Sequence, residues 1–161
     1  MRTATATALF LALAVGPSCA SWVTPRVQLQ DSLDVLRRQS VAWNEGDIDG
    51  FLDGYRRSGD TVFVSNGDRT VGFEKVASRF RSRYGSSSET MGRLAFDEID
   101  LLPLCQDSVA VNGRFILDAS DGTRSWGRFT VILRRYEDVG WKIVHDHTST
   151  PVETPPEPRG F

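Results

Sequence analysis

The second half of the chain alternates apolar and polar residues with a period of two, and this pattern restricts the fold more than any other feature. It predicts strands near Arg93–Leu102, Ser108–Ala119, Arg124–Tyr136 and Trp141–Thr150. Two of the connections contain the turn-forming pairs Asp121-Gly122 and Val139-Gly140. Consecutive strands joined by short turns usually pair with each other, so we expect an antiparallel meander.

The segment Phe129–Leu133 carries apolar residues on both faces of its predicted strand. A sheet that contains such strands needs cover on both sides. Helices can cover one side and a second subunit the other. The sequence therefore predicts a homodimer.

Helical periodicity precedes the meander. Spacings of four and three predict a first helix whose buried face carries Leu29, Leu33, Leu36, Ser40 and Trp43. Gly46 is expected to end this helix and Asp47 to cap a short second one. A strand over residues 61–65 and a third helix over residues 73–84 follow. Helices followed by a four-strand meander are typical of an α+β roll, in which a strongly curved antiparallel sheet folds around three helices and leaves a conical cavity.

The two ends of the chain are expected to lie outside this domain. Residues 1–20 have a basic start, a short apolar run and small residues before Ala20, which is the order of a signal peptide. The apolar run is too short for a membrane span. We expect cleavage after Ala20 and export to the periplasm or the medium, with lipidation of Cys19 as the alternative. Residues 21–26 are expected to form a linker, residues 27–150 the domain, and the proline-rich residues 151–161 a disordered tail.

Charge and cysteine content exclude several functions. The chain has 19 basic and 21 acidic side chains, and signal cleavage would remove one of the basic residues, Arg2. Without a basic excess, nucleic-acid binding is not expected. Cys105 would be the one cysteine left after cleavage, so no intrachain disulfide or cysteine-based metal site is predicted. No cofactor is predicted either.

The last predicted strand reads Trp141-Lys-Ile-Val-His-Asp-His-Thr-Ser149 and contains both histidines of the chain. Strict alternation places the odd-numbered residues, His145 and His147 among them, on one face. Alternation places Asp146 on the opposite face, which makes it a poor candidate for a site with the histidines. Side chains two apart on a strand are about 6.5–7 Å apart, a spacing that suits two contacts to one ligand.

Two segments resemble the nuclear transport factor 2-like, or SnoaL-like, superfamily. They are Ala42-Trp-Asn-Glu-Gly-Asp-Ile-Asp49, followed by Tyr55, and the strand Trp141–Ser149. The resemblance covers about residues 33–149 and is nearest to bacterial families of unknown function with similar His-x-His-x-Ser endings. It implies the roll described above. It does not assign an activity, because the superfamily contains isomerases, dehydratases, cyclases and non-catalytic binding or assembly domains.

The ketosteroid isomerases of this superfamily use a tyrosine and two acids, and the resemblance aligns those three positions with Gln39, Val64 and Ile132. Neither a tyrosine nor an acid lies within one residue of any of them. A valine cannot accept a proton from a substrate. The sequence therefore argues against isomerisation of that type.

The resemblance also implies which residues face the cavity. It turns the odd-numbered face of the last strand inward, with His145, His147 and Ser149, and one face of the preceding strand, with Trp126, Arg128, Thr130 and Ile132. Trp43, Tyr55 and Tyr84 lie on apolar helix faces, where aromatic residues belong to the core more often than to a binding site. We nevertheless include these three among the candidate ligand contacts.

The histidine pair has three interpretations. Both rings can be buried and neutral; they can anchor a ligand or act as acid and base, since histidine titrates near neutral pH; or they can bind a metal, although no third ligand is apparent nearby. Three functions follow. The protein binds a small, partly apolar molecule; it is an enzyme that uses His145 or His147; or it is an assembly domain without a ligand.

Overall fold

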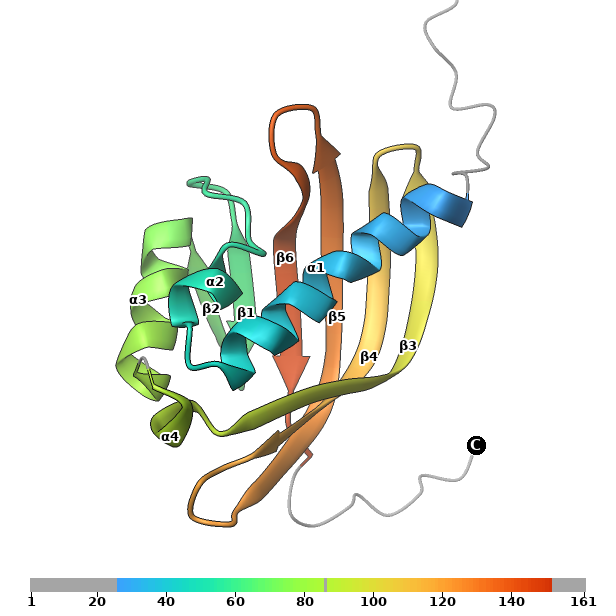
Figure 1. The fold of residues 1–161 in the computed structure, drawn as a ribbon. Coiled ribbons are helices and arrows are strands. Elements are labelled where there is room, and N and C mark those ends of the chain that lie inside the picture. Colours follow the sequence, from blue (N-terminus) through green and yellow to red (C-terminus); the bar gives the residue numbers. More distant parts are fainter. Residues whose placement is uncertain (1–25, 86, 152–161) are drawn as a thin grey trace, which may run out of the picture.

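A computed structural model describes residues 26–85 and 87–151 of the chain (Figure 1). The predicted signal peptide, nearly all of the predicted linker and nearly all of the predicted tail lie outside the described residues. None of the helices in the described ranges is long and apolar enough to cross a membrane.

Helices and strands follow one another largely in the predicted order. They are α1 (Arg26–Asn44), α2 (Ile48–Leu52), β1 (Val62–Ser65), β2 (Asp68–Val71), α3 (Phe73–Tyr84), α4 (Ser88–Met91), β3 (Arg93–Cys105), β4 (Ser108–Asp118), β5 (Arg124–Tyr136) and β6 (Gly140–Ser149). The strand β2 and the short helix α4 are the elements among them that the sequence pattern did not predict, because four residues are too few to show a period.

Local signals account for the boundary between α1 and α2. Gly46 has a φ of 78°, a left-handed conformation that glycine adopts without strain, and the chain leaves α1 there. The carboxylate of Asp47 then accepts a hydrogen bond from the backbone N–H of Gly50 at 2.8 Å and caps α2. Both predictions for this boundary are confirmed.

The six strands form one sheet in the order β2-β1-β6-β5-β4-β3. Strands β3 to β6 form the predicted antiparallel meander. Strand β1 pairs with β6 in parallel, which is the one departure from a fully antiparallel sheet. Because β6 is the last strand of the meander, it has an unpaired edge, and β1 occupies that edge.

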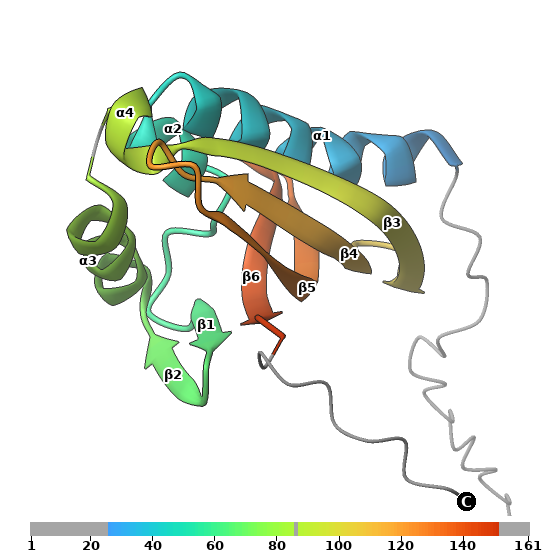
Figure 2. The same cartoon turned by 90° about the horizontal axis from the view of Figure 1, so that it is seen from below.

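The helices lie on one side of this curved sheet and enclose the core. Figure 2 shows α1 running along the sheet formed by β3 to β6, while α3 lies beside β1 and β2 at one end. The α+β roll predicted from the sequence is therefore confirmed.

Irregular positions in two strands shape the sheet around the helices. In β3 the pairing with β4 shifts between Asp97 and Asp100, and Glu98 between them has a φ of 50°. In β6 the pairing with β5 skips one residue, since Ile143 pairs with Leu133 and His145 with Ile132. Val144 is thus the extra residue of a β-bulge, a feature that bends a strand and reverses which side chains face inward beyond it.

Candidate functional site

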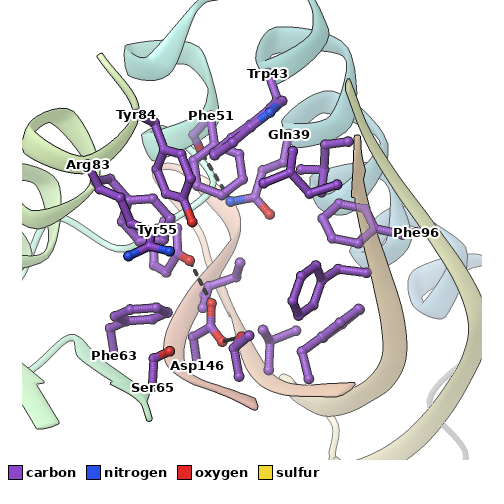
Figure 3. A pocket seen from close by; sticks show the side chains of 18 of the residues that line it. Gln39, Trp43, Phe51, Tyr55, Phe63, Ser65, Arg83, Tyr84, Phe96 and Asp146 are labelled. Atoms are coloured by element: carbon purple, nitrogen blue, oxygen red, sulfur yellow. Dashed lines mark hydrogen bonds between the residues drawn. The ribbon is translucent and has the colours of Figure 1, made fainter. Parts of the chain in front are cut away.

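A cavity of about 210 Å³ lies between the inner face of the sheet and the helices (Figure 3). Its wall is mainly aromatic and aliphatic: the apolar lining residues include Trp43, Phe51, Tyr55, Phe63, Phe80, Tyr84, Phe96, Phe115, Phe129 and Val131. Four of its lining residues are exposed to solvent and mark its mouth: Asn66, Arg83, Ser125 and Thr150.

A buried carboxyl group, that of Asp146, belongs to the lining of this cavity. Only 6% of this residue is accessible to solvent. The hydroxyl of Tyr55 donates a hydrogen bond to Oδ2 of Asp146 at 2.6 Å, and the hydroxyl of Thr148 donates one to Oδ1 at 2.8 Å (Figure 3). A carboxylate can accept about four hydrogen bonds, so Asp146 retains acceptor capacity for a ligand.

Main-chain pairing places Tyr55 beside Asp146. The N–H of Ile143 donates to the carbonyl oxygen of Gly54, and the N–H of Arg56 donates to the carbonyl oxygen of Ile143, both at 2.8 Å. Tyr55 is thereby held next to β6 at the bulge, where only 2% of the residue is accessible and its ring packs against those of Phe51 and Phe80. The phenol therefore reaches the carboxyl from a fixed position.

Burial dominates the electrostatics of this pair. It raises the pKa of Asp146 from 3.8 to about 6, against the opposing effect of the hydrogen bonds from Tyr55 and Thr148. Burial, followed by the nearby charge of Asp146, also raises the pKa of Tyr55 well above its ordinary value. Tyr55 therefore remains a hydrogen-bond donor, while Asp146 can be either protonated or ionised near neutral pH.

The bulge corrects our assignment of faces in β6. Trp141 and Ile143 face inward as predicted, but beyond Val144 it is the even-numbered residues Asp146 and Thr148 that line the cavity. His145, His147 and Ser149 are absent from its lining, and His147 and Ser149 are exposed. The inward orientation predicted for these three was wrong because one extra residue changes the side on which every later side chain lies.

The assignment of faces in β5 was wrong as well. Phe129 and Val131 line the cavity, whereas Trp126, Arg128 and Thr130 are exposed on the outer face and Ile132 shares that face. Arg128 forms an ion pair with Glu98, and Thr130 donates a hydrogen bond to Asn112. The even-numbered face of β5 carries three arginines, Arg124, Arg128 and Arg134, whereas the odd-numbered residues from Ser125 to Leu133 are uncharged. Turning the uncharged face toward the helices therefore avoids burying charge.

Of the residues predicted from the sequence, Trp43, Tyr55 and Tyr84 are brought together in the cavity wall. Asp146, Thr148, Arg79 and Arg83 also line it and were not predicted as site residues. The contrast in charge between the two faces of β5 could have corrected that strand, but the sequence carries no comparable signal for the bulge that turns Asp146 inward.

The two histidines lie together on the outer face of the sheet, between β1 and β5. Burial lowers the pKa of His145, and the positive charges of His147 and Arg69 lower it further. Within the described ranges no group of three histidine, cysteine, aspartate or glutamate side chains could hold a metal ion.

Comparison with known protein families identifies the domain. The model of the SnoaL-like domain family matches residues 33–153, which is most of the chain. The chain belongs to the SnoaL-like domain family. Among curated proteins no significant match to this SnoaL-like chain was found.

Solved structures support the fold of the SnoaL-like domain. An NTF2-like protein of unknown function from Shewanella oneidensis has 29% sequence identity and a TM-score of 0.70, and the match covers 75% of this chain and 98% of that one. A ketosteroid isomerase-like protein from Erwinia carotovora atroseptica has 18% identity and a TM-score of 0.63, with 81% and 99% covered. A putative calcium/calmodulin dependent protein kinase II association domain from Xanthomonas campestris has 17% identity and a TM-score of 0.61, with 78% and 89% covered.

Proposed function

We propose that this SnoaL-like domain binds a small, largely apolar molecule in its cavity and holds a polar group of that molecule against Asp146. The observation that carries the proposal is the buried carboxyl with its two hydrogen-bond donors in a mainly apolar cavity. Binding cavities are typically apolar with a few fixed polar groups that orient the ligand.

The size of the cavity limits the ligand. Its volume is about 210 Å³. An apolar cavity of roughly 150 Å³ accepts benzene, and the smallest pockets for drug-sized ligands have roughly 300 Å³, so this volume lies between the two. A molecule with one or two rings, or an aliphatic molecule of similar size, fits this range.

The polar group of the ligand follows from the chemistry of Asp146. When ionised, the carboxylate accepts hydrogen bonds from a hydroxyl or amine; when protonated, it donates one to a carbonyl oxygen. Tyr55 and Thr148 already donate to it, which fixes the orientation of the carboxyl group. We therefore expect a ligand with a hydroxyl, amine or carbonyl group at its inner end.

A fragment screen tests this proposal. One- and two-ring molecules with a hydroxyl, amine or carbonyl group are screened by ligand-observed NMR against the wild type and Ser65→Trp. Ser65 lines the cavity, so the indole of the variant is expected to fill it and abolish binding.

The matched control is Val64→Trp, since Val64 precedes Ser65 on β1 and is not part of the cavity lining. The control should retain binding, and circular dichroism checks that both variants are folded. If no fragment loses its binding signal in Ser65→Trp while keeping it in Val64→Trp, the proposal is wrong.

A second candidate function is acid–base catalysis by Asp146 in place of the histidines. Its support is the pKa of about 6 that burial gives this carboxyl, because a general base works best with a pKa near the working pH.

Hydrogen exchange distinguishes catalysis from binding alone. Carbonyl-containing fragments that bind are incubated in D₂O, where a base takes a proton from the carbon beside the carbonyl and a deuteron returns to it. Acceleration by the wild type but not by Asp146→Asn supports catalysis. Equal exchange with both proteins, at unchanged affinity, rejects it.

Export remains part of the proposed function. Residues 1–20 have the composition and order of a signal peptide, and we propose cleavage after Ala20. Mass spectrometry of the mature N-terminus tests this, since a chain that begins at Ser21 supports it and one with a lipidated Cys19 supports the anchored form.

We also propose that a second copy covers the outer face of the sheet. This proposal is supported by large apolar side chains that are exposed there, since Leu102 is 57% and Trp126 44% accessible. Monomeric proteins seldom expose contiguous apolar surface without a partner.

A further inference from the structure

Two arginines of α3 border the cavity. Arg79 and Arg83 are four residues apart, so they lie on the same face of the helix, and both belong to the cavity lining. Arg83 extends from α3 toward the cavity beside Tyr84 (Figure 3). Arg81 lies between them in the sequence but outside the lining.

The two arginines differ from their neighbour in their charge partners. Arg81 forms an ion pair with Asp49 at 2.7 Å. Among the residues that the structure describes, no ion pair includes Arg79 or Arg83. Two positive charges on the same helix face destabilise a helix, so this arrangement leaves a repulsion that an anion in the cavity would relieve.

Neighbouring side chains hold both guanidinium groups without using all of their donors. Arg79 donates from Nη1 to the hydroxyl oxygen of Thr70 at 3.1 Å and stacks over Phe63, with 5.1 Å to the ring centre. The guanidinium of Arg83 lies 5.4 Å from the ring centre of Tyr84. A guanidinium has five N–H donors, so most of those on the two arginines remain available to a ligand.

The carboxyl group and the guanidinium groups of the cavity lining have opposite character and differ in burial. Asp146 is the carboxyl group of the cavity lining and is buried, whereas Arg83 is exposed at the mouth. A negatively charged group beside an ionised Asp146 would be repelled, whereas beside Arg79 and Arg83 it would meet two cations. The charges of the cavity therefore favour one orientation for an anionic ligand.

We propose that the ligand is a small amphipathic anion whose carboxylate, or similar acidic group, is bound by Arg79 and Arg83 where α3 borders the cavity. Its apolar body then extends inward along the aromatic wall. This inference rests on the proposed binding function and adds the chemical class of the ligand. A carboxylate suits the site because its two oxygens match the paired donors of a guanidinium.

A matched pair of probes tests the inference: indole-3-acetate is anionic, and indole-3-ethanol is a neutral molecule of nearly the same size. Their affinities for the full chain are measured by isothermal titration calorimetry. Charge-assisted hydrogen bonds stabilise a complex by about 1.5–3 kcal/mol, so we expect the acid to bind at least about tenfold more tightly than the alcohol.

Paired variants assign the preference to the two arginines. In Arg79→Gln/Arg83→Gln the affinity for indole-3-acetate should fall at least about tenfold, with little change for indole-3-ethanol. The control Lys75→Gln/Arg81→Gln removes two positive charges from the same helix outside the cavity and should keep the preference for the acid.

The outcomes separate this inference from the proposed function. In one adverse result indole-3-ethanol binds as tightly as the acid, and in another both paired variants lower the affinity for the acid equally. Either result rejects an acidic ligand but leaves the proposal of binding in the cavity intact. The inference also fails if neither indole binds while fragments without an acidic group do. If no fragment of either kind binds, the proposed function itself is wrong.

Discussion

At the scale of single residues, Asp146 is the position where sequence and structure differ most. It stands between two histidines in a strand, and strict alternation from Trp141 assigned it to the outer face. In the structure it is buried with a tyrosine and a threonine as donors. Burial of an acid is unfavourable unless hydrogen bonds compensate it, and Tyr55 provides such a bond from a segment 91 residues away in sequence.

The raised pKa of Asp146 predicts a pH dependence of stability. Between pH 3.8 and about 6 the folded protein holds this proton more tightly than the unfolded chain does, so the free energy of unfolding falls as the pH rises through that window. The full effect corresponds to about 3 kcal/mol. Asp146→Asn lacks this titration, and its stability should decline less over the same window.

Urea unfolding over a series of pH values measures this difference. Asp60→Asn is the control, because Asp60 is exposed and its replacement should leave the wild-type curve unchanged in shape. Parallel curves for the wild type and Asp146→Asn would contradict the assignment of a raised pKa to Asp146.

At the scale of elements, the bulge in β6 decides which residues form the site. A regular strand with Ile143 inward would carry His145 inward and Asp146 outward. Because Val144 is an extra residue in the pairing with β5, His145 instead turns outward and Asp146 inward. The bulge has no sequence signature of its own. It becomes visible only through the pairing of β6 with β5 and with the segment around Gly54.

This geometry predicts that the two possible one-residue deletions in β6 differ in effect. Deleting Val144 removes the bulge residue and leaves Trp141, Ile143 and Asp146 facing inward, so the variant should fold with reduced stability. Deleting Lys142 instead turns Trp141 outward, away from the core to which it contributes. Chemical unfolding should show the larger loss for the Lys142 deletion, and an equal or larger loss for the Val144 deletion would refute this account of the bulge.

At the scale of the whole molecule, the sheet has one face under the helices and one facing outward. The alternation and the order of helices and strands were sufficient to predict this roll, because each element buries a face that the next can cover. The face of β5 that turns inward was predicted wrongly, since both faces of this strand carry apolar residues. The same two-sided character led us to expect a second copy of the chain.

The proposed dimer predicts different effects for two equally exposed apolar residues. Leu102 lies on the outer face of the sheet and Val41 on α1, and each is 57% accessible. Leu102→Glu should place a charge in the interface and shift the protein to monomer, whereas Val41→Glu should leave a dimer. Light scattering over micromolar concentrations measures both, and a monomeric wild type would reject the dimer.

The sequence by itself determined the order of the elements, the cap between α1 and α2 and the curved roll, because these depend on periodicity and turn residues that act over short distances. It also identified Trp43, Tyr55 and Tyr84 as members of the cavity wall. Only the tertiary structure decided that Asp146 faces the cavity and the histidines do not. The reason is physical: a one-residue bulge has no periodic signal, and the partners of Asp146 and the arginines of α3 come together through pairing of segments that are distant in the chain.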